Sequence, residues 1–417
     1  MYSTRENLKD KFSMKVVFFT ADSNGGYPVP AVRGGAVSTL IEHLVSENNR
    51  KQLFNMTIVS LFDKEAVLKS SQYPNINFIW IRVPFFFRWL DKLLFFIVLH
   101  CFPNKKAISY RSVFSLLFYI VKSSIQLKRI APDKIILENN IPLAWIVRFS
   151  KYTGEVWYHL HNIPRTNAKC KQVFEKCKYL CVSKYVAEEI EKDANPIGPV
   201  AKENIKILYN CIDTELFKQQ KVESDFLREK YSINDTDKVI LFVGRLSAEK
   251  GVDKVMEAVK LLNDKSVKLL IAGSLLSNAN IKDAYQNKLS ALATELKDNI
   301  LFTGYVPQTE LPKFYNMADI SVLPSVWEEP AGLTMVESMA CGLPVITTQS
   351  GGIPEYVANC GIVLPVDDNL SRNIAEKIDI LFANDALRKS LSENAVKRSN
   401  ENFSSKNYLD YFYNSIL

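Results

Sequence analysis

Two cationic side chains follow an apolar strand pattern at the start of the second half of the chain. The run Val239–Val243 leads into Gly244-Arg245, and Lys250 stands five residues later, shortly before the next helical pattern. A strand, a loop and a helix start form a place where backbone N–H groups and the helix dipole favour an anion. Arg245 and Lys250 would add two charges there and could hold a diphosphate without a metal ion. The alternative is a pair of solvated surface cations, and the position at a helix start favours the phosphate site.

Two glutamates form the second candidate group. Glu329 lies in a loop with proline and glycine after an apolar run, and Glu337 lies eight residues later in a predicted helix. A carboxylate accepts two hydroxyl groups at once, so Glu337 suits a ribose diol and Glu329 suits the hydroxyls of a sugar. The N–H groups at the start of that helix, near Gly332, suit a phosphate. The alternatives are a carboxylate at a helix N-terminus and an exposed helix residue.

The elements that must position these residues are strands and helices in alternation. Short apolar and β-branched runs, separated by helical patterns, predict parallel, doubly wound sheets. In such sheets ligands bind beyond the carboxyl ends of the strands, where both candidate groups lie. The predicted strands form two series, one at residues 15–20, 56–61, 77–82, 134–138, 155–161 and 179–183, the other at residues 239–243, 268–272, 300–302, 320–323, 345–347 and 362–364.

The two series predict two domains. They are separated near residues 209–223, where the polarity of the sequence rises. We therefore predict an α/β protein of two tandem Rossmann-like domains, residues 1–210 and 211–400, that face a cleft. Residues 401–417 are expected to form a C-terminal helix that packs back on the first domain. The length of 417 residues agrees with this division, because it suits two domains of about 200 residues better than one core.

The composition is that of a folded protein, with 47% apolar and 23% charged residues. No apolar run precedes Lys15 and none reaches the roughly 18 residues of a membrane span, so neither a signal peptide nor a transmembrane helix is expected. The seven cysteines show no disulfide framework, which suits a reducing compartment. We expect a cytoplasmic protein. No G-x-G-x-x-G follows the first strand of either series, which weakens a dehydrogenase interpretation.

One cluster of cysteines raises the question of a zinc site. Cys170, Cys177 and Cys181 follow His159 and His161 in the sequence. Their spacing matches no common zinc pattern, and Cys181 lies in an apolar, strand-like run. Buried thiols are therefore the favoured interpretation.

Positive charge is concentrated in the first half of the chain. Residues 1–200 hold 28 Lys and Arg against 16 Asp and Glu, whereas the remainder holds 24 against 29. Residues 82–130 carry nine basic residues, a single acidic one, Asp91, and many aromatic and aliphatic ones. A basic, aromatic and amphipathic stretch suits a helix that lies on anionic lipid. The alternative, two core-packed helices with solvated cations, stays open at this point.

Taken together, the chain resembles the retaining glycosyltransferases with the GT-B fold, the group known as family 4. The resemblance covers nearly the whole length. The motifs that carry it are Gly-Arg-Leu…Glu-Lys-Gly at residues 244–251, the glutamates 329 and 337, residues 340–346, residues 351–355, Gly34-Gly35 after the first strand, and His161 at the end of Tyr-His-Leu-His.

The resemblance implies a role for each candidate residue of the second domain. Arg245 and Lys250 would hold the diphosphate of a nucleotide sugar and stabilise it as the leaving group. Glu337 would bind the ribose, and Glu329 would contact the donor sugar. The other donor contacts are assigned to Gly244, Val306, Gly332, Leu333 and Thr334, with the base near Val306.

In the first domain the resemblance implies that Gly34 and Gly35 approach the donor phosphate with their backbone, because side chains there would obstruct it. Gly35 would lie near the reacting centre, and His161 near the donor sugar. The alternatives are an ordinary flexible turn for the glycines and a structural role for the histidine.

The implied activity is the retaining transfer of a hexose or an N-acetylhexosamine from a nucleoside diphosphate sugar, by family frequency a UDP-sugar. No cofactor, no metal ion and no protein nucleophile are expected. Asp235-Thr236-Asp237, the sole D-x-D string, precedes a strand and suits a turn rather than a metal site. Ala331 stands where many relatives carry Phe or Ser, which leaves the donor sugar open.

The expected partners are the nucleotide sugar and a glycan or lipid-linked saccharide acceptor of surface polysaccharide synthesis. Through residues 82–130 the protein would also meet an anionic membrane surface on the cytoplasmic side, and no nucleic acid is expected. Two other classes stay open: another enzyme with this fold, such as a UDP-sugar 2-epimerase or a phosphorylase, and a non-catalytic scaffold. Such scaffolds often lose charged site residues, whereas this chain keeps Arg245, Lys250, Glu329 and Glu337.

Overall fold

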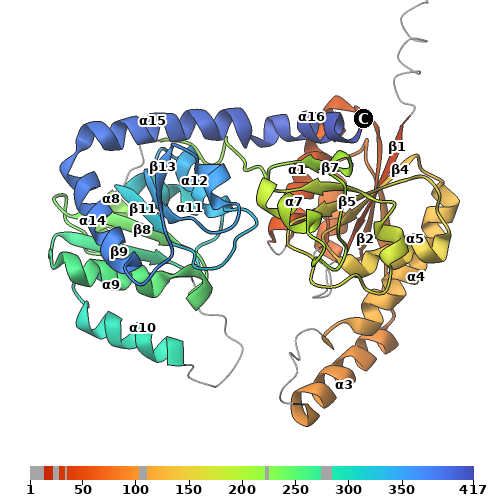
Figure 1. The fold of residues 1–417 in the computed structure, drawn as a ribbon, viewed down its shortest axis with the longest axis horizontal. Helices are drawn as coiled ribbons and strands as arrows, with labels where there is room; N and C mark the ends of the chain where they lie inside the picture. The colour runs from red at the N-terminus through yellow and green to blue at the C-terminus, as the bar shows by residue number, and fades with distance from the viewer. Residues whose placement is uncertain (1–13, 22–27, 33–34, 103–109, 221–224, 274–283) are drawn as a thin grey trace, which may run out of the picture. The chain divides into compact units, whose positions relative to one another are not determined.

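The computed structural model describes residues 14–21, 28–32, 35–102, 110–220, 225–273 and 284–417. The chain divides into two compact units (Figure 1). Unit 1 is Met1–Leu208 together with Lys406–Leu417, and unit 2 is Tyr209–Ser405. Each unit is built on a single parallel sheet, as the alternating strand and helix patterns predict.

Unit 1 contains a seven-stranded sheet in the order β3-β2-β1-β4-β5-β6-β7. The inner strand β1 has no exposed surface from Val16 to Phe19, as expected for a strand that is covered on both faces. Strand β7 was not predicted, because its three residues make too short an apolar run. The strands are β1 Lys15–Thr20, β2 Asn55–Leu61, β3 Asn77–Ile81, β4 Lys134–Glu138, β5 Glu155–Leu160, β6 Lys178–Cys181 and β7 Ile205–Ile207.

The C-terminal helix of the chain is part of unit 1. Helix α16 buries Tyr408, Leu409, Phe412 and Ile416, and the ring of Phe412 lies 5.4 Å from that of Phe18 in β1. The helices of this unit are α1 Ala36–Lys51, α2 Lys64–Ser70, α3 Phe85–Cys101, α4 Val113–Ile130, α5 Ala144–Ser150, α6 Lys171–Phe174, α7 Lys184–Glu191 and α16 Ser405–Ile416.

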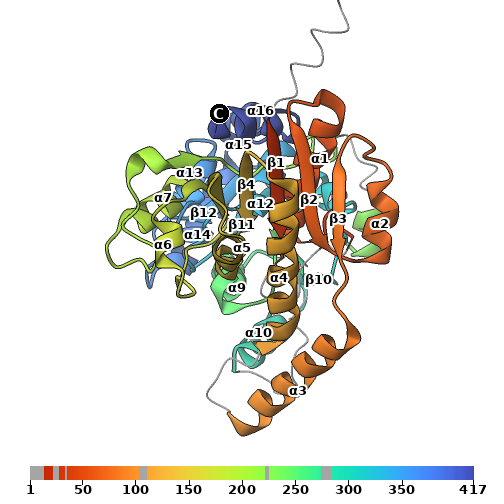
Figure 2. The ribbon, with the colours of Figure 1, turned by 90° about the vertical axis from the view of Figure 1, so that its right-hand side faces the viewer.

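Helices α3 and α4 differ in how they are packed. The Tyr119 hydroxyl of α4 donates to the carbonyl oxygen of Val59 in β2 at 2.6 Å, so α4 packs on the sheet. Helix α3 touches α4 through the rings of Phe87 and Phe118, 4.9 Å apart, and buries few of its residues. Figure 2 shows α3 extending away from the sheet. The core-packed alternative therefore holds for α4 and fails for α3. Among the described helices none is long and apolar enough to cross a bilayer.

Unit 2 contains a six-stranded parallel sheet in the order β10-β9-β8-β11-β12-β13. The order reverses at β8, from which the chain runs first to one edge and then back to β11 on the other side. Ligand sites of doubly wound sheets lie at such reversals, beyond the carboxyl ends of the strands. The strands are β8 Lys238–Val243, β9 Val267–Ala272, β10 Ile300–Gly304, β11 Ile320–Leu323, β12 Val345–Thr348 and β13 Gly361–Leu364.

One long helix of unit 2 has no counterpart in the sequence predictions. Helix α15 is polar on most sides and buries only Leu391, Ala395 and Ser399, so it lacks the apolar stripe that predicts a helix. It runs past residue 400, where the domain boundary was expected. The helices of this unit are α8 Asp225–Lys230, α9 Val252–Leu262, α10 Ala284–Glu295, α11 Leu311–Met317, α12 Leu333–Ala340, α13 Ile353–Val357, α14 Leu370–Ala383 and α15 Asp385–Asn402.

Candidate functional site

The loop between β8 and α9 brings Lys250 into contact with Glu329. Gly251 ends this loop with a φ of 67°, and a Cβ at that position would lie 2.1 Å from the carbonyl oxygen of Pro324. Only glycine allows the loop to approach so closely. The approach places Lys250 beside the segment that follows β11, and its ammonium pairs with the Glu329 carboxylate. Two residues that the sequence analysis put in separate motifs thus form one ion pair.

Arg245 lies on the same loop in a different setting. Its side chain is 56% exposed, and its Nη2 lies 3.9 Å from Oε2 of Glu249, whose side chain is 53% exposed. An exposed pair of this length contributes little stability. Lys250, in contrast, is 28% exposed and its partner Glu329 only 12%. In this structure the two predicted cations therefore face different carboxylates, one at the surface and one in a partly buried site.

The backbone of Glu329 is held by the turn at Gly351 and Gly352. The N–H of Gly352 donates to the carbonyl oxygen of Glu329 at 2.7 Å. A Cβ at Gly351 would lie 2.3 Å from the same oxygen, and Gly351 has a φ of 57°. The side chain of Glu329 is held as well, because the Ser325 hydroxyl donates to its Oε1 at 2.9 Å. The glycine motif at 351–352 thus acts by positioning Glu329.

Glu337 is a buried carboxyl group on α12, with 5% of its surface exposed. Its Oε2 accepts a hydrogen bond from the hydroxyl of Tyr315 at 3.1 Å, and its Oε1 accepts one from Nε2 of Gln308 at 3.2 Å. Burial raises the pKa of Glu337 to about 7, against the smaller opposing effect of these two hydrogen bonds. The group therefore changes its charge near neutral pH. Neither Gln308 nor Tyr315 was predicted, because no motif marks them.

The start of α12 keeps its first backbone N–H groups available. Gly332 is the N-cap residue and no side chain caps this end, so the amides of Leu333 and Thr334 lie in an uncapped first turn. A Cβ at Gly332 would lie 2.6 Å from the sulfur of Met335. Val306, the remaining predicted contact, packs partly buried against the core of unit 2, two residues before Gln308.

A glycine directly follows or ends each of three neighbouring strands of unit 2, namely β8, β9 and β10. The N–H of Gly244 after β8 donates to Ala272 at the end of β9, and the N–H of Gly273 donates to Gly304 of β10, both at 3.0 Å. A Cβ at Gly273 would lie 1.8 Å from the carbonyl oxygen of Gly244. This edge of the sheet is therefore bare backbone that a ligand can approach. Gly273 was not predicted, although a glycine directly after each of the apolar runs 239–243 and 268–272 was a visible signal.

Unit 1 contains a cavity of about 130 Å³ beyond the carboxyl ends of β1 and β4. Gly35, at the start of α1, lines it together with Thr20, Glu138 and Asn139. Gly35 has a φ of 121°, a conformation that favours glycine. The other predicted glycine, Gly34, lies outside the described residues.

His161 belongs to a buried group of three titratable side chains. Its Nε2 lies 3.4 Å from Oε2 of Glu138, and Nδ1 of His159 lies 3.0 Å from the same oxygen. Burial alone would raise the pKa of Glu138, but the two histidines outweigh it and lower the pKa to about 2. Glu138 is thus a buried carboxylate that holds both imidazole rings. Glu138 was not predicted as a site residue. His159 and His161 both contact its Oε2.

Glu138, His159 and His161 could together hold a metal ion, since one ligand atom from each lies within 4.8 Å of the others. Cys170, Cys177 and Cys181 belong to no such group among the described residues and are buried, free thiols. Burial raises the pKa of all three. The buried-thiol interpretation is confirmed.

Comparison with known proteins agrees with this architecture. Residues 223–398 match the family described as glycosyl transferases group 1. YtcC of Bacillus subtilis, named as a glycosyltransferase, is 27% identical over 397 residues, which cover 92% of this chain and 87% of YtcC. The lipopolysaccharide 1,2-N-acetylglucosaminetransferase of Salmonella typhimurium is 26% identical over 231 residues, 54% of this chain and 56% of that protein. HepE of Anabaena, solved in complex with UDP, is 17% identical with a TM-score of 0.70 over 97% of this chain and 99% of HepE.

The two parallel sheets and the likeness to solved structures define the GT-B fold. The chain has this fold, and its residues 223–398 match the glycosyl transferases group 1 family. The family match runs from before α8 into α15, and so includes Lys250, Glu329 and Glu337.

Proposed function

We propose that this glycosyltransferase moves a hexose or an N-acetylhexosamine from a UDP-sugar to a glycan or lipid-linked saccharide acceptor of surface polysaccharide synthesis. We further propose that it retains the configuration of the anomeric carbon, needs no metal ion and works at the cytoplasmic face of the membrane. The solved complexes of HepE with UDP and with UDP-glucose support a uridine nucleotide as donor. The name of the Salmonella relative supports a glycan acceptor.

The observation that carries the proposal is the contact between Lys250 and Glu329. Lys250 is the partly buried cation of the β8–α9 loop, and its partner lies four residues before the uncapped start of α12 at Leu333. A diphosphate at this start would receive the helix dipole, two amides and the Lys250 ammonium. Binding would draw Lys250 away from Glu329 and free that carboxylate to accept hydroxyl groups of the donor sugar.

The same group accounts for the chemical step. As the bond between the anomeric carbon and the β-phosphate oxygen breaks, negative charge grows on the phosphate, and the ammonium and the helix start stabilise it there. The acceptor hydroxyl attacks from the face that the phosphate leaves, and its proton passes to that phosphate. No protein nucleophile takes part. Glu337 would hold the ribose, and His161, kept in place by Glu138, would face the donor sugar.

The test is a donor screen with the purified full chain. A panel of UDP- and GDP-sugars is offered with membrane lipid extract or defined glycans as acceptors, and the release of nucleoside diphosphate is measured with and without EDTA. We expect turnover with a UDP-sugar, unchanged by EDTA, an α-linked product from an α-linked donor, and a loss of at least about 100-fold in Lys250→Ala. Lys254→Ala, on the next helix, is the matched control and should keep its activity.

The other outcomes separate the alternatives. Conversion of the UDP-sugar to its 2-epimer without acceptor would overturn the proposal in favour of an epimerase. UDP binding with no turnover of any donor would indicate a scaffold, and equal activity in both lysine variants would remove Lys250 from the mechanism.

A further inference from the structure

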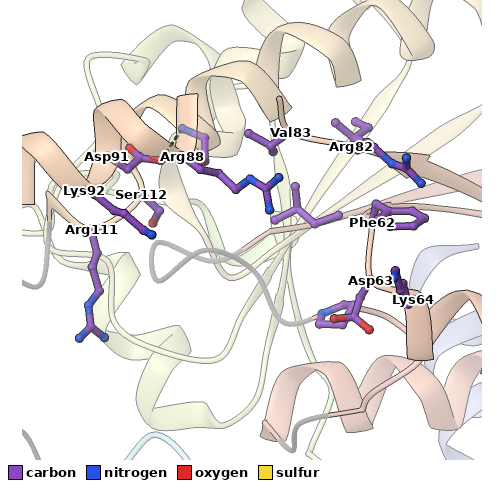
Figure 3. A pocket seen from close by; sticks show the side chains of 14 residues that line it. Phe62, Asp63, Lys64, Arg82, Val83, Arg88, Asp91, Lys92, Arg111 and Ser112 are labelled. Atoms are coloured by element: carbon purple, nitrogen blue, oxygen red, sulfur yellow. Dashed lines mark hydrogen bonds between the residues drawn. The ribbon is translucent and has the colours of Figure 1, made fainter. Parts of the chain in front are cut away.

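A second cavity of unit 1, about 660 Å³ in volume, lies at the carboxyl ends of β2 and β3 and is also lined by α3 and the start of α4 (Figure 3). Its lining is rich in cations, which come from four separate segments of the chain. They are Lys64, Arg82, Arg88, Lys92 and Arg111. The cavity is therefore lined by positive groups that the fold, not a single run of sequence, brings together.

The two carboxylates of this cavity are occupied by backbone groups. Asp63 is the N-cap of α2 and accepts from the N–H groups of Glu65 and Ala66. Asp91, only 3% exposed, accepts from the N–H groups of Phe114 at 2.7 Å and Ser115 at 3.1 Å at the start of α4. Asp91 thus has both oxygens in hydrogen bonds to the start of α4, and Asp63 caps α2 through its Oδ1.

Among the described residues these cations have no acidic partner. Within the described residues no carboxylate lies within ion-pair distance of any of the five. Arg82 lies over the ring of Phe62, 4.0 Å from its centroid, which orients the guanidinium without neutralising it. A cavity with this excess of fixed positive charge attracts a multiply charged anion, and phosphate groups match the donor geometry of arginine.

Helix α3 joins this cavity to an exposed apolar face. Arg88 and Lys92 lie four residues apart on the side that lines the cavity. Trp89, Leu93 and Phe96 lie about 100° further round the same helix and are 48%, 42% and 59% exposed. Phe85, Phe86 and Ile97 add to the exposed apolar surface of α3. A helix with aromatic and aliphatic residues beside a cationic face is suited to lie in the interface of an anionic bilayer.

The cavity also lies close to the predicted reacting centre within unit 1. In the sheet order β3-β2-β1-β4, this cavity follows β2 and β3, and the smaller cavity of Gly35 and Glu138 follows β1 and β4. Both open at the same edge of the sheet. Two strand spacings separate them, roughly 10 Å, so a headgroup bound in one reaches toward the other.

We propose that the Arg88–Lys92 cavity binds the phosphate or diphosphate of a membrane lipid that carries the acceptor sugar, while the apolar face of α3 enters the bilayer interface. This inference rests on the proposed function and names the acceptor class for it. The phosphate fixes the headgroup in unit 1, and α3 keeps the lipid chain in the membrane. Soluble glycans without a phosphate would lack this anchor.

The test uses the full chain and neutral phosphatidylcholine vesicles that contain a polyprenyl diphosphate. Flotation of the wild type, of Arg88→Gln/Lys92→Gln and of the matched control Lys171→Gln/Lys176→Gln is compared at physiological salt. We expect the cavity variant to bind these vesicles at least about tenfold more weakly and the control, which loses the same charge, to bind as the wild type does. Trp89→Gln/Phe96→Gln should lose vesicle binding but keep its affinity for inorganic diphosphate in calorimetry.

Further measurements separate the sources of the phosphate and the two proposals. Equal binding to vesicles in which phosphatidylserine replaces the diphosphate lipid at matched charge would overturn the inference, as would equal binding by the cavity variant and the wild type. Hydrolysis of the UDP-sugar without acceptor should be the same in Arg88→Gln/Lys92→Gln and in the wild type. If the wild type turns over no donor, the proposed function fails. If it does and the cavity variant uses the lipid acceptor equally well, only this inference fails.

Discussion

The ammonium of Lys250 and the carboxylate of Glu329 are in contact although they lie 79 positions apart in the chain. The contact joins the loop after β8 to the segment before α12, and so unites the two motifs that the family resemblance treats separately. In the absence of a ligand, each of the two residues is therefore the ion-pair partner of the other. An anionic ligand that binds Lys250 therefore competes with the Glu329 carboxylate for the ammonium.

The first prediction concerns Glu329 itself. In Glu329→Gln the ammonium of Lys250 loses its partner, so a diphosphate no longer competes with a carboxylate for it. We expect UDP to bind equally well or up to about tenfold more tightly, while turnover of the UDP-sugar falls at least about 100-fold because the sugar contact is lost. Calorimetry with UDP and steady-state kinetics measure the two effects. If the affinity for UDP falls together with turnover, the proposed competition between the diphosphate and Glu329 for Lys250 is contradicted.

A second prediction follows from the close approach of Gly351 to Glu329. In Gly351→Ala the new Cβ would lie 2.3 Å from the Glu329 carbonyl oxygen at a φ of 57°, so the turn must shift. We expect a loss of about 2 kcal/mol in the free energy of unfolding, from a urea titration, and a higher KM for the donor.

Gly304→Ala is the control for this variant. Gly304 also has a positive φ, 73°, but a Cβ there meets nothing within 4 Å. It should therefore lose only the backbone contribution of about 1 kcal/mol. Equal losses of stability in the two variants would show that contact with Glu329 is not what requires glycine at 351.

The third prediction is a pH dependence of nucleotide binding. Burial raises the pKa of Glu337 to about 7, and only its ionised form accepts both ribose hydroxyls. Affinity for UDP should therefore fall as the pH drops below about 7. Glu337→Gln should bind more weakly at high pH and lose this dependence, keeping only the slope due to the ionisation of the UDP phosphate. An unchanged slope in the variant would exclude Glu337 as the titrating group.

The same shift has a consequence for stability, with the opposite sign. Because the folded-state pKa of Glu337 is raised, its contribution to stability is full below the unfolded value of 4.5 and is lost as the pH rises through about 7. Glu337→Gln cannot ionise, so its urea midpoint should rise relative to that of the wild type as the pH increases from 4.5 to about 7. If the difference between the two proteins stays constant across this range, the carboxyl is not buried as the structure has it.

The fourth prediction concerns Glu138. Its pKa is lowered to about 2 by His159 and His161, against the effect of burial, so it stabilises the fold above the unfolded value of 4.5 and loses this contribution as the pH falls toward 2. Glu138→Gln should cost on the order of 3 kcal/mol at neutral pH and less at acid pH. Urea unfolding at several pH values measures both. A difference that is independent of pH would contradict the ion-pair account.

The architecture was largely predictable from sequence because the strands of both sheets are buried on two faces. Inner strands of this kind appear as short apolar runs, as in Val239–Val243, and lie where they were expected, whereas the short edge strand β7 was not predicted. Helix α15 was not predictable in this way, because tertiary packing of three small or aliphatic residues holds it and its surface is otherwise polar.

The charged motifs of the candidate site stand out in the sequence, whereas its supporting residues do not. Gly351 was recognised within a motif, but its role in holding Glu329 depends on a contact between loops that no spacing reveals. Glu138 and Gln308 are single polar residues whose importance arises from burial and from the partner that the fold brings to them. Their carboxylate or amide type alone carries no signal for such a role.

The central claim, that Lys250 belongs to a diphosphate site, is tested most directly by comparing UDP with uridine in calorimetry on the wild type, Lys250→Ala and Lys254→Ala. We predict that Lys250→Ala weakens the binding of UDP at least about tenfold and leaves that of uridine unchanged, and that Lys254→Ala changes neither. Equal affinities of Lys250→Ala and the wild type for UDP, or an equal loss for uridine, would contradict the account.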